Sequence, residues 1–144
     1  MGAYHGKQFK ILYVDDDEDD RVFFNIALQD IDKTHQCITA INGKDAFEKL
    51  NANRTYIPDF IFLDLNMPIM NGKQFLQEIK KNPHQAEIPI VIYTTSSFYK
   101  DMEETKMLGA THFLTKPSNI DKLTKILTIL FQKQNLPFLL NSEI

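Results

Sequence analysis

Acidic side chains and one lysine follow apolar runs of this chain, at positions where they could together bind a metal ion and a phosphoryl group. Asp15 and Asp16 follow the first such run, Asp64 ends the third, and Lys116 follows the last. If these runs are strands of an open α/β sheet, their carboxyl ends meet where such sheets place their ligand sites. Three acids and one lysine at that edge predict a metal-assisted phosphoryl site.

The carboxylates of Asp15, Asp16 and Asp64 would repel one another in a small space, and at least one would be driven towards protonation. A hard divalent cation removes this cost, and Mg²⁺ is often held by one or two carboxylates together with waters and phosphate oxygens. A backbone carbonyl of the loop after Asp64, such as that of Asn66, could add a ligand. We therefore expect a Mg²⁺ site formed by these residues.

Asp64 is also placed to act as a nucleophile, because an aspartate can attack a phosphoryl group and form an acyl phosphate. Such a transfer depends on in-line positioning and charge neutralisation, which a metal ion and Lys116 would provide. Taken singly, Asp64 could be a strand-terminating turn and Lys116 a solvated lysine. Their shared position at one edge of the predicted sheet favours the functional interpretation.

Hydroxyl groups gather after the fourth apolar run, at Thr94, Thr95, Ser96 and Ser97. They could form a polar turn that caps the following helix. Alternatively, a hydroxyl and backbone N–H groups of this run could contact phosphate oxygens. Both interpretations can hold for different members of the run.

Five short strand-like runs alternate with helix-like segments along the chain. Nearly continuous apolar stretches are typical of strands buried on both faces, and strand–helix alternation indicates βαβ units in a parallel sheet. The expected strands are 9–14, 36–41, 60–64, 88–95 and 111–115, and the expected helices are 19–30, 43–50, 72–81, 98–108 and 119–131. In the first helix, the spacing predicts that Val22, Phe23, Ile26 and Ala27 share the buried face.

The acidic run 15–20 divides into two parts. Acids at a helix N-terminus cap free N–H groups and complement the helix dipole, and this explains Asp17 to Asp20. It suits Asp15 and Asp16 less well, because they come directly after the strand.

Length and composition narrow the class of protein. A chain of 144 residues predicts one domain, and a net charge of −3 argues against nucleic acid as the main partner. Cys37 is the only cysteine, so no internal disulfide can form and a reducing compartment is favoured; we expect this thiol to be buried and inert. Since no secretory signal and no run near the ~20 apolar residues of a membrane span is present, a soluble cytoplasmic protein without a membrane partner is expected.

In its motifs and their order, the chain resembles the receiver domain of two-component response regulators, in particular the stand-alone chemotaxis-type receivers and those that partner phytochrome-type kinases. The residues that carry the resemblance are Val14-Asp15-Asp16, Leu63-Asp64-Leu65-Asn66-Met67-Pro68 with Met70 and Gly72, Thr94-Thr95-Ser96, and Leu108-Gly109-Ala110 leading to Phe113-Leu114-Thr115-Lys116-Pro117. The resemblance implies a flavodoxin-like α/β fold with strand order 2-1-3-4-5 and five helices, a receiver domain over residues 8–133, and a tail over 134–144 with no separate output domain.

The resemblance also implies roles for single residues. Asp64 would be the phosphoacceptor, and Asp15 and Asp16 the acidic pair that positions Mg²⁺, with Asp16 the direct ligand and Asn66 offering its backbone carbonyl. Lys116 would contact the phosphoryl group, followed by a cis peptide bond to Pro117. Thr94 would be the switch hydroxyl, and Thr95 would bind phosphate through its backbone N–H. Phe113 would be the aromatic rotor, although a plain core aromatic is an equal alternative for it. Asn66 and Ser96 would tune the rate of dephosphorylation.

The expected function is therefore phosphorelay signalling rather than catalysis on a separate substrate. The partners implied are a sensor histidine kinase or a histidine phosphotransfer protein, and a downstream protein target. A phosphorylation-independent interaction module on the same fold is the alternative. An aspartyl phosphatase is disfavoured because Asn66 stands where its second acid would be, and a flavin protein because acids fill the loop after the first strand.

The C-terminal tail and the histidines carry no predicted chemical role. The apolar tail beyond Gln134 could fold back on the core or cover a partner surface, which makes a homodimer conceivable. The four histidines, His5, His35, His84 and His112, lack metal-ligand spacing and are expected on the surface or in loops.

Overall fold

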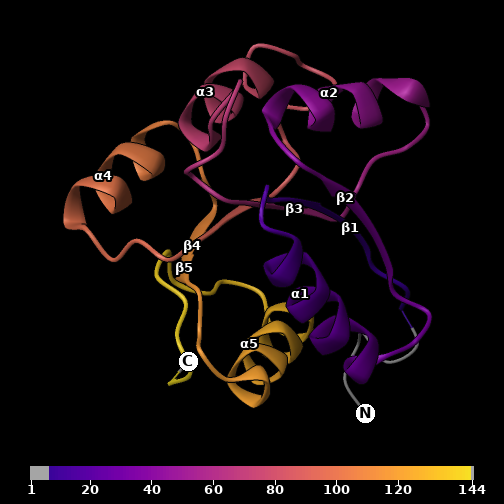
Figure 1. Cartoon of the computed structure of the whole chain (residues 1–144), viewed down its shortest axis with the longest axis vertical. Helices are drawn as coiled ribbons and strands as arrows, with labels where there is room; N and C mark the ends of the chain where they lie inside the picture. Colours follow the sequence, from indigo (N-terminus) through magenta and orange to yellow (C-terminus); the bar gives the residue numbers. More distant parts are fainter. Residues whose placement is uncertain (1–6, 144) are drawn as a thin grey trace.

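A five-stranded parallel sheet of order β2-β1-β3-β4-β5 forms the centre of the computed structural model, which describes residues 7–143 (Figure 1). The strands are β1 (Lys10–Val14), β2 (Gln36–Ala40), β3 (Phe60–Leu63), β4 (Ile90–Thr94) and β5 (His112–Thr115). The helices of the described residues are α1 (Glu18–Ile31), α2 (Gly43–Ala52), α3 (Gly72–Ile79), α4 (Tyr99–Met107) and α5 (Ile120–Gln132). The flavodoxin-like order and the five helices were predicted correctly, and every boundary lies within two residues of the predicted one.

The helices form two layers, with α1 and α5 on one face of the sheet and α2, α3 and α4 on the other (Figure 1). Alternate strand residues supply the two cores: Tyr13 packs with the α1–α5 layer, whereas Leu12 and Val14 pack with the other. The two layers explain why the central strands are apolar at nearly every position, as expected for parallel strands covered on both sides.

The buried face of α1 was predicted correctly for Ala27 and in part for Phe23, which is half-buried, but incorrectly for Val22 and Ile26. Val22 and Ile26 are 54% and 53% exposed, and the residues buried there are Phe24, Ala27 and Leu28. The segment 22–28 is apolar at every position except Asn25, so two stripes at helical spacing were available. The ring of Phe24 decides between them, because it packs against Tyr13 with ring centroids 4.4 Å apart and buries a larger area than Val22 could.

The register of the strands brings their carboxyl ends to one edge. Val14 pairs with Leu63, and Thr94 pairs with Thr115. Because Asp15 follows the first pair on one side and Asp64 on the other, the two acids must emerge on neighbouring strands.

The tail folds back on the outer edge of β5, one of the two outcomes that the sequence left open. The N–H of Phe113 donates to the carbonyl of Phe138 at 2.8 Å, and the N–H of Leu140 donates to the carbonyl of Phe113 at 2.9 Å. Leu140 is buried in the α1–α5 core, and the rings of Phe113 and Phe138 lie 6.4 Å apart. The tail therefore continues the sheet beside β5.

The prediction of surface or loop histidines was wrong for His112, which lies within β5, whereas His35 does lie in the loop before β2. His35 and His112 are buried, with Nδ1 of His35 accepting the N–H of Phe9 at 3.0 Å. His84 is exposed as expected, and His5 lies outside the described residues. The rings of Phe9 and Phe131 pack against the imidazole of His35, and Nδ1 of His112 lies 2.8 Å from the carbonyl oxygen of Pro137.

The thiol of Cys37 lies half-buried in β2, less enclosed than predicted. Burial raises the pKa of this thiol to about 12, so it stays protonated and unreactive near neutral pH. Across residues 7–143, none of the helices is both long and apolar enough to cross a bilayer.

Candidate functional site

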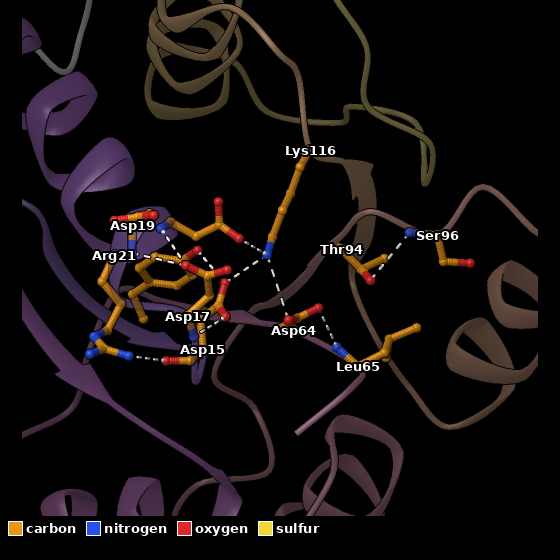
Figure 2. Close-up of polar contacts among 11 residues, drawn as sticks. Asp15, Asp17, Asp19, Arg21, Asp64, Leu65, Thr94, Ser96 and Lys116 are labelled. Carbon is orange, nitrogen blue, oxygen red and sulfur yellow. Dashed lines mark hydrogen bonds and ion pairs between the residues drawn. The ribbon is translucent and has the colours of Figure 1, made fainter. Parts of the chain in front are cut away.

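Asp15, Asp64 and Lys116 converge at the carboxyl edge of the sheet (Figure 2), and a carboxylate oxygen of Asp16 lies close to those of the other two acids. Nζ of Lys116 lies 2.7 Å from Oδ2 of Asp15 and 3.6 Å from Oδ2 of Asp64. Lys116 follows β5, Asp15 follows β1 and Asp64 follows β3. The strand order therefore makes the lysine reach over β4 to the acids at the ends of β3 and β1. A cation at this position offsets part of the charge of two neighbouring buried carboxylates.

Asp15 is fully buried and its carboxylate is held by three donors. The hydroxyl of Tyr13 donates to Oδ2 at 2.7 Å, Lys116 donates to the same oxygen, and the N–H of Asp17 donates to Oδ1 at 3.0 Å. Burial, followed by the charge of Asp15, raises the pKa of Tyr13 far above its ordinary value, so the phenol remains a donor. Since a carboxylate has about four acceptor positions, one remains for a further ligand.

Asp64 is 8% exposed and lies directly after β3. The N–H of Leu65 donates to its Oδ1 at 2.8 Å, which leaves Oδ2 facing Lys116 (Figure 2). Burial raises the pKa of the Asp64 carboxyl; Lys116 acts against this rise and Asp15 adds to it. Because burial makes this carboxyl costly to ionise, a cation bound beside it would stabilise the ionised form.

Lys116 is held more tightly than the sequence predicted. Its side chain is 9% exposed, and burial lowers the pKa of its ammonium, but hydrogen bonds to Asp15 and Asp20 outweigh this and leave the pKa above its usual value. The lysine is therefore a fixed positive charge rather than a solvated side chain.

Asp20 is a member of the site that sequence reasoning missed. Its Oδ2 lies 2.7 Å from Nζ of Lys116, although the run 17–20 was assigned to capping of α1. The capping assignment is correct for Asp17, whose Oδ1 accepts the N–H groups of Asp19 and Asp20. No sequence signal singled out Asp20, because it lies among six consecutive acids and its partner Lys116 is 96 residues away.

Oxygen ligands suitable for a divalent cation are present in the predicted set. One carboxylate oxygen from each of Asp15, Asp16 and Asp64 lies within 4.8 Å of the other two, and Asp16 is the exposed member. Ligands bonded to Mg²⁺ at about 2.1 Å lie about 3–4 Å apart, so a small contraction or a bridging water would complete the fit. Asn66 lies two residues beyond Asp64 on the exposed loop, where its predicted ligand role remains a prediction.

The loop after β3 is held close to Asp64 by Gly72, the first residue of α3. The N–H of Gly72 donates to the carbonyl of Leu65 at 3.0 Å, and a Cβ at position 72 would lie 2.2 Å from the carbonyl oxygen of Asp64. Ile69, in the same loop, has a φ of 68°, a conformation that is costly for a β-branched residue. The sequence thus has glycine where the helix must approach the backbone of Asp64.

Thr94 and Ser96 bound the site on the side of β4. Thr94 is fully buried, and its Oγ1 accepts the N–H of Ser96 at 3.4 Å (Figure 2). The Ser96 hydroxyl donates to Asp101 in α4 and accepts the N–H of Phe98, so the run forms a polar turn before α4, but the predicted side-chain cap is absent at the N-cap residue Phe98. Contact of this run with phosphate oxygens remains a prediction. Thr95 is exposed between Thr94 and Ser96, and its phosphate-binding role remains a prediction.

Phe113 is 1% exposed and packs in the core with α2, α3 and α4 residues. Its ring is a core aromatic in this structure, and its role as a rotor remains a prediction. The predicted cis peptide bond before Pro117 was wrong, because the described residues contain no cis bond. The trans form is the lower-energy isomer of an X–Pro bond by about 0.5–1 kcal/mol, and the Lys116 ammonium reaches its partners from it.

Comparison with known proteins agrees with this geometry. Residues 11–128 match the family model described as the response regulator receiver domain. The chain is 33% identical over 120 residues to the response regulator Rcp1 of Synechocystis, a match that covers 81% of this chain and 82% of Rcp1. It is also 34% identical over 137 residues to a probable cyclic di-GMP phosphodiesterase of Vibrio cholerae, covering 94% of this chain but 30% of that protein.

Solved structures give the same result. The chemotaxis response regulator CheY4 of Vibrio cholerae superposes with a TM-score of 0.73 at 32% identity, covering 85% of this chain and 98% of CheY4. The Mn²⁺-bound form of Rcp1 superposes with a TM-score of 0.78 at 29% identity, covering 90% and 99%. The chain spans about a third of the length of the curated relatives that match first, since the phosphodiesterase and several protein-glutamate methylesterases are longer. From its strand order, its acid–lysine cluster and these matches, the chain belongs to the response regulator receiver domain family.

Proposed function

We propose that this chain accepts a phosphoryl group on Asp64 from a phosphohistidine of a sensor histidine kinase or a histidine phosphotransfer protein. The observation that supports this most strongly is the arrangement around Asp64: one carboxylate oxygen bound by Leu65, the other 3.6 Å from Nζ of Lys116. Two further carboxylates, Asp15 and Asp16, lie within metal-binding distance. Among relatives, one superposing structure is that of the phosphorylated cyanobacterial phytochrome response regulator RcpA.

In the transfer step, an oxygen of the Asp64 carboxylate attacks phosphorus while the bond from phosphorus to the imidazole nitrogen breaks. The imidazole leaves with the bonding electron pair and takes up a proton, and Asp64 becomes an acyl phosphate. Bound at Asp15, Asp16, Asp64 and the carbonyl of Asn66, Mg²⁺ would supply positive charge to the phosphoryl oxygens. The nucleophile must be ionised, and the positive charge of Lys116 favours that form.

The new phosphoryl group would then be held by this chain's own donors. Lys116 supplies a charged donor, Thr94 a hydroxyl and Thr95 a backbone N–H, each from the strand-end loops around Asp64. Water later attacks phosphorus and releases inorganic phosphate, which restores the carboxylate. Asn66 and Ser96 flank the group and would tune that rate.

The output would be a change in shape rather than a reaction on a second substrate. Movement of Thr94 towards the phosphoryl group leaves space near Phe113, whose reorientation would alter the face formed by α4, β5 and α5. We infer that a downstream protein target binds this face, and a second copy of the chain is a further candidate partner. The tail beside β5 lies next to Phe113 and would sense the same movement.

A test uses phosphoramidate, a small donor whose phosphorus–nitrogen bond resembles that of phosphohistidine. Intact mass after incubation with Mg²⁺ should show one added phosphoryl group on the native chain and on Asp19→Asn, a control in which the same Asp-to-Asn change is made in α1 at a residue without an ion pair to Lys116. Asp64→Asn should show none, and chelation of Mg²⁺ should abolish the adduct. A folded native chain that never acquires the group would favour the phosphorylation-independent interaction module.

A further inference from the structure

Asp20 holds the ammonium of Lys116 on the α1 side of the site, away from Asp64. Nζ of Lys116 is 2.7 Å from Oδ2 of Asp20 and 2.7 Å from Oδ2 of Asp15, but 3.6 Å from Oδ2 of Asp64. An ammonium has three N–H donors, and two of them are committed to these acids. The distance to Asp64 exceeds that of a good charged hydrogen bond, which is about 2.7–2.9 Å.

The start of α1 does not need Asp20. Asp17 caps the helix through its side chain, and Glu18 and Asp19 already place negative charge in the first turn. Asp20 occupies the third helical position, where a capping-box residue would reach back to the backbone N–H of Asp17. Its carboxylate instead contacts a lysine 96 residues further along the chain.

Two carboxylates and one incoming phosphoryl group therefore compete for a single lysine. When a cation binds Asp15, its attraction for Oδ2 weakens the contact with Lys116, and Asp20 becomes the main restraint on the ammonium. Only the third N–H of the ammonium is uncommitted, and movement of Nζ towards a phosphoryl oxygen on Asp64 would lengthen its 2.7 Å contact with Asp20.

We propose that Asp20 is a positioning residue that restrains Lys116 in the unphosphorylated state and releases it when a phosphoryl group is formed on Asp64. This inference rests on the proposed function and adds a residue to it. The restraint weakens binding of the phosphoryl group by the amount needed to displace Asp20, and it keeps Lys116 from forming a close hydrogen bond with Asp64 before transfer.

The test measures beryllofluoride affinity by ¹⁹F NMR at saturating Mg²⁺, because beryllofluoride on a carboxylate has the shape and charge of a phosphoryl group. Replacing Asp20 by Asn removes a charged competitor for Lys116, so Asp20→Asn should bind beryllofluoride about threefold to tenfold more tightly than the native chain. Asp19→Asn, which changes the charge equally without touching Lys116, should shift affinity by less than about twofold.

Repeating the comparison in a Lys116→Gln background separates positioning from a general charge effect. There, Asp20→Asn should change affinity by no more than about twofold, because no lysine remains to be released. An equal gain in both backgrounds would overturn the positioning role, as would unchanged or weaker binding by Asp20→Asn alone.

A second measurement does not depend on any variant. In the beryllofluoride complex of the native chain, Lys116 should contact a fluoride and lie beyond hydrogen-bonding distance of Asp20; a lysine that keeps its bond to Asp20 would overturn the inference. If the native chain binds no beryllofluoride, both the proposed function and this inference are overturned. Native binding without a gain for Asp20→Asn overturns the inference alone.

Discussion

Nζ of Lys116 lies 2.7 Å from Oδ2 of Asp15, so two buried side chains 101 residues apart in sequence join the carboxyl ends of β5 and β1. The side chain of Lys116 therefore reaches from the outer strand β5 past β4 and β3 to β1, and Asp64 follows β3 on this path. A charge pair at this depth is expensive to break, because the remaining partner stays desolvated.

Replacing Lys116 by Met should therefore lower the free energy of unfolding by about 2–3 kcal/mol, since Asp15 keeps its charge but loses a charged donor. Tyr13 and the N–H of Asp17 still bind that carboxylate, which limits the loss. Urea denaturation measures the effect. Lys81→Met provides the control, because Lys81 forms an exposed ion pair with Glu78 and its loss should change stability little. Equal losses for the two variants would contradict the buried pair.

Substituting Ala for Gly72 should damage both stability and the site. The added Cβ would lie 2.2 Å from the carbonyl oxygen of Asp64, so either α3 or the end of β3 must move, at a cost of about 1–3 kcal/mol or more. The same movement should weaken Mg²⁺ binding, measured by calorimetry.

Gly109→Ala separates the loss of stability from the loss of Mg²⁺ affinity. Gly109 has a φ of 99° and lies away from the acids, so alanine there should cost about 1 kcal/mol of stability through backbone strain but leave Mg²⁺ affinity unchanged. If Gly72→Ala bound Mg²⁺ as well as the native chain does, the close approach of α3 to Asp64 would not matter to the site.

Asp64→Asn should make the metal-free protein more stable at neutral pH. Burial and Asp15 raise the pKa of Asp64 in the folded state despite Lys116, so the ionised side chain disfavours folding at any pH above that pKa. The asparagine keeps an oxygen for the N–H of Leu65 and removes the charge, so a gain of about 1 kcal/mol, or about 2–5 °C in Tm, is expected. Adding Mg²⁺ should raise the Tm of the native chain more than that of the variant. A variant less stable than the native chain without metal would refute the assigned cost.

Acid should destabilise the fold through His35. Burial lowers the pKa of this imidazole, with Asp32 acting weakly in the opposite direction, and Nδ1 accepts the N–H of Phe9. The unfolded chain therefore binds the proton more readily, so stability is complete above the ordinary histidine pKa of about 6.5 and falls as the pH drops below it.

Thermal unfolding between pH 7.5 and 5.5 measures this loss. His35→Gln should have a lower Tm at pH 7.5 but a flatter pH dependence over that interval. The exposed His84 supplies the control, because His84→Gln should keep the pH dependence of the native chain. An unchanged slope for His35→Gln would assign the acid sensitivity elsewhere, for example to the buried His112.

The sequence predicted the elements and the strand-end residues because strands buried on both faces are apolar throughout, and the acids that follow them stand out. It failed where one pattern allowed two solutions. The apolar segment 22–28 offered two buried faces of α1, and the packing of Phe24 against Tyr13 chose between them. Asp20 was lost within six consecutive acids, since its partner Lys116 is close only after the sheet has formed.

The phosphoacceptor role of Asp64 is tested most directly by identifying the residue that carries the phosphoryl group. After reaction with acetyl phosphate and Mg²⁺, borohydride reduces an aspartyl phosphate to homoserine, which peptide mass spectrometry can locate. If Asp64 is the phosphoacceptor, homoserine should form at position 64 alone, should depend on Mg²⁺ and should be absent from Asp64→Asn. Homoserine at another acid of the site, or none in a chain that is folded and binds Mg²⁺, would contradict that role.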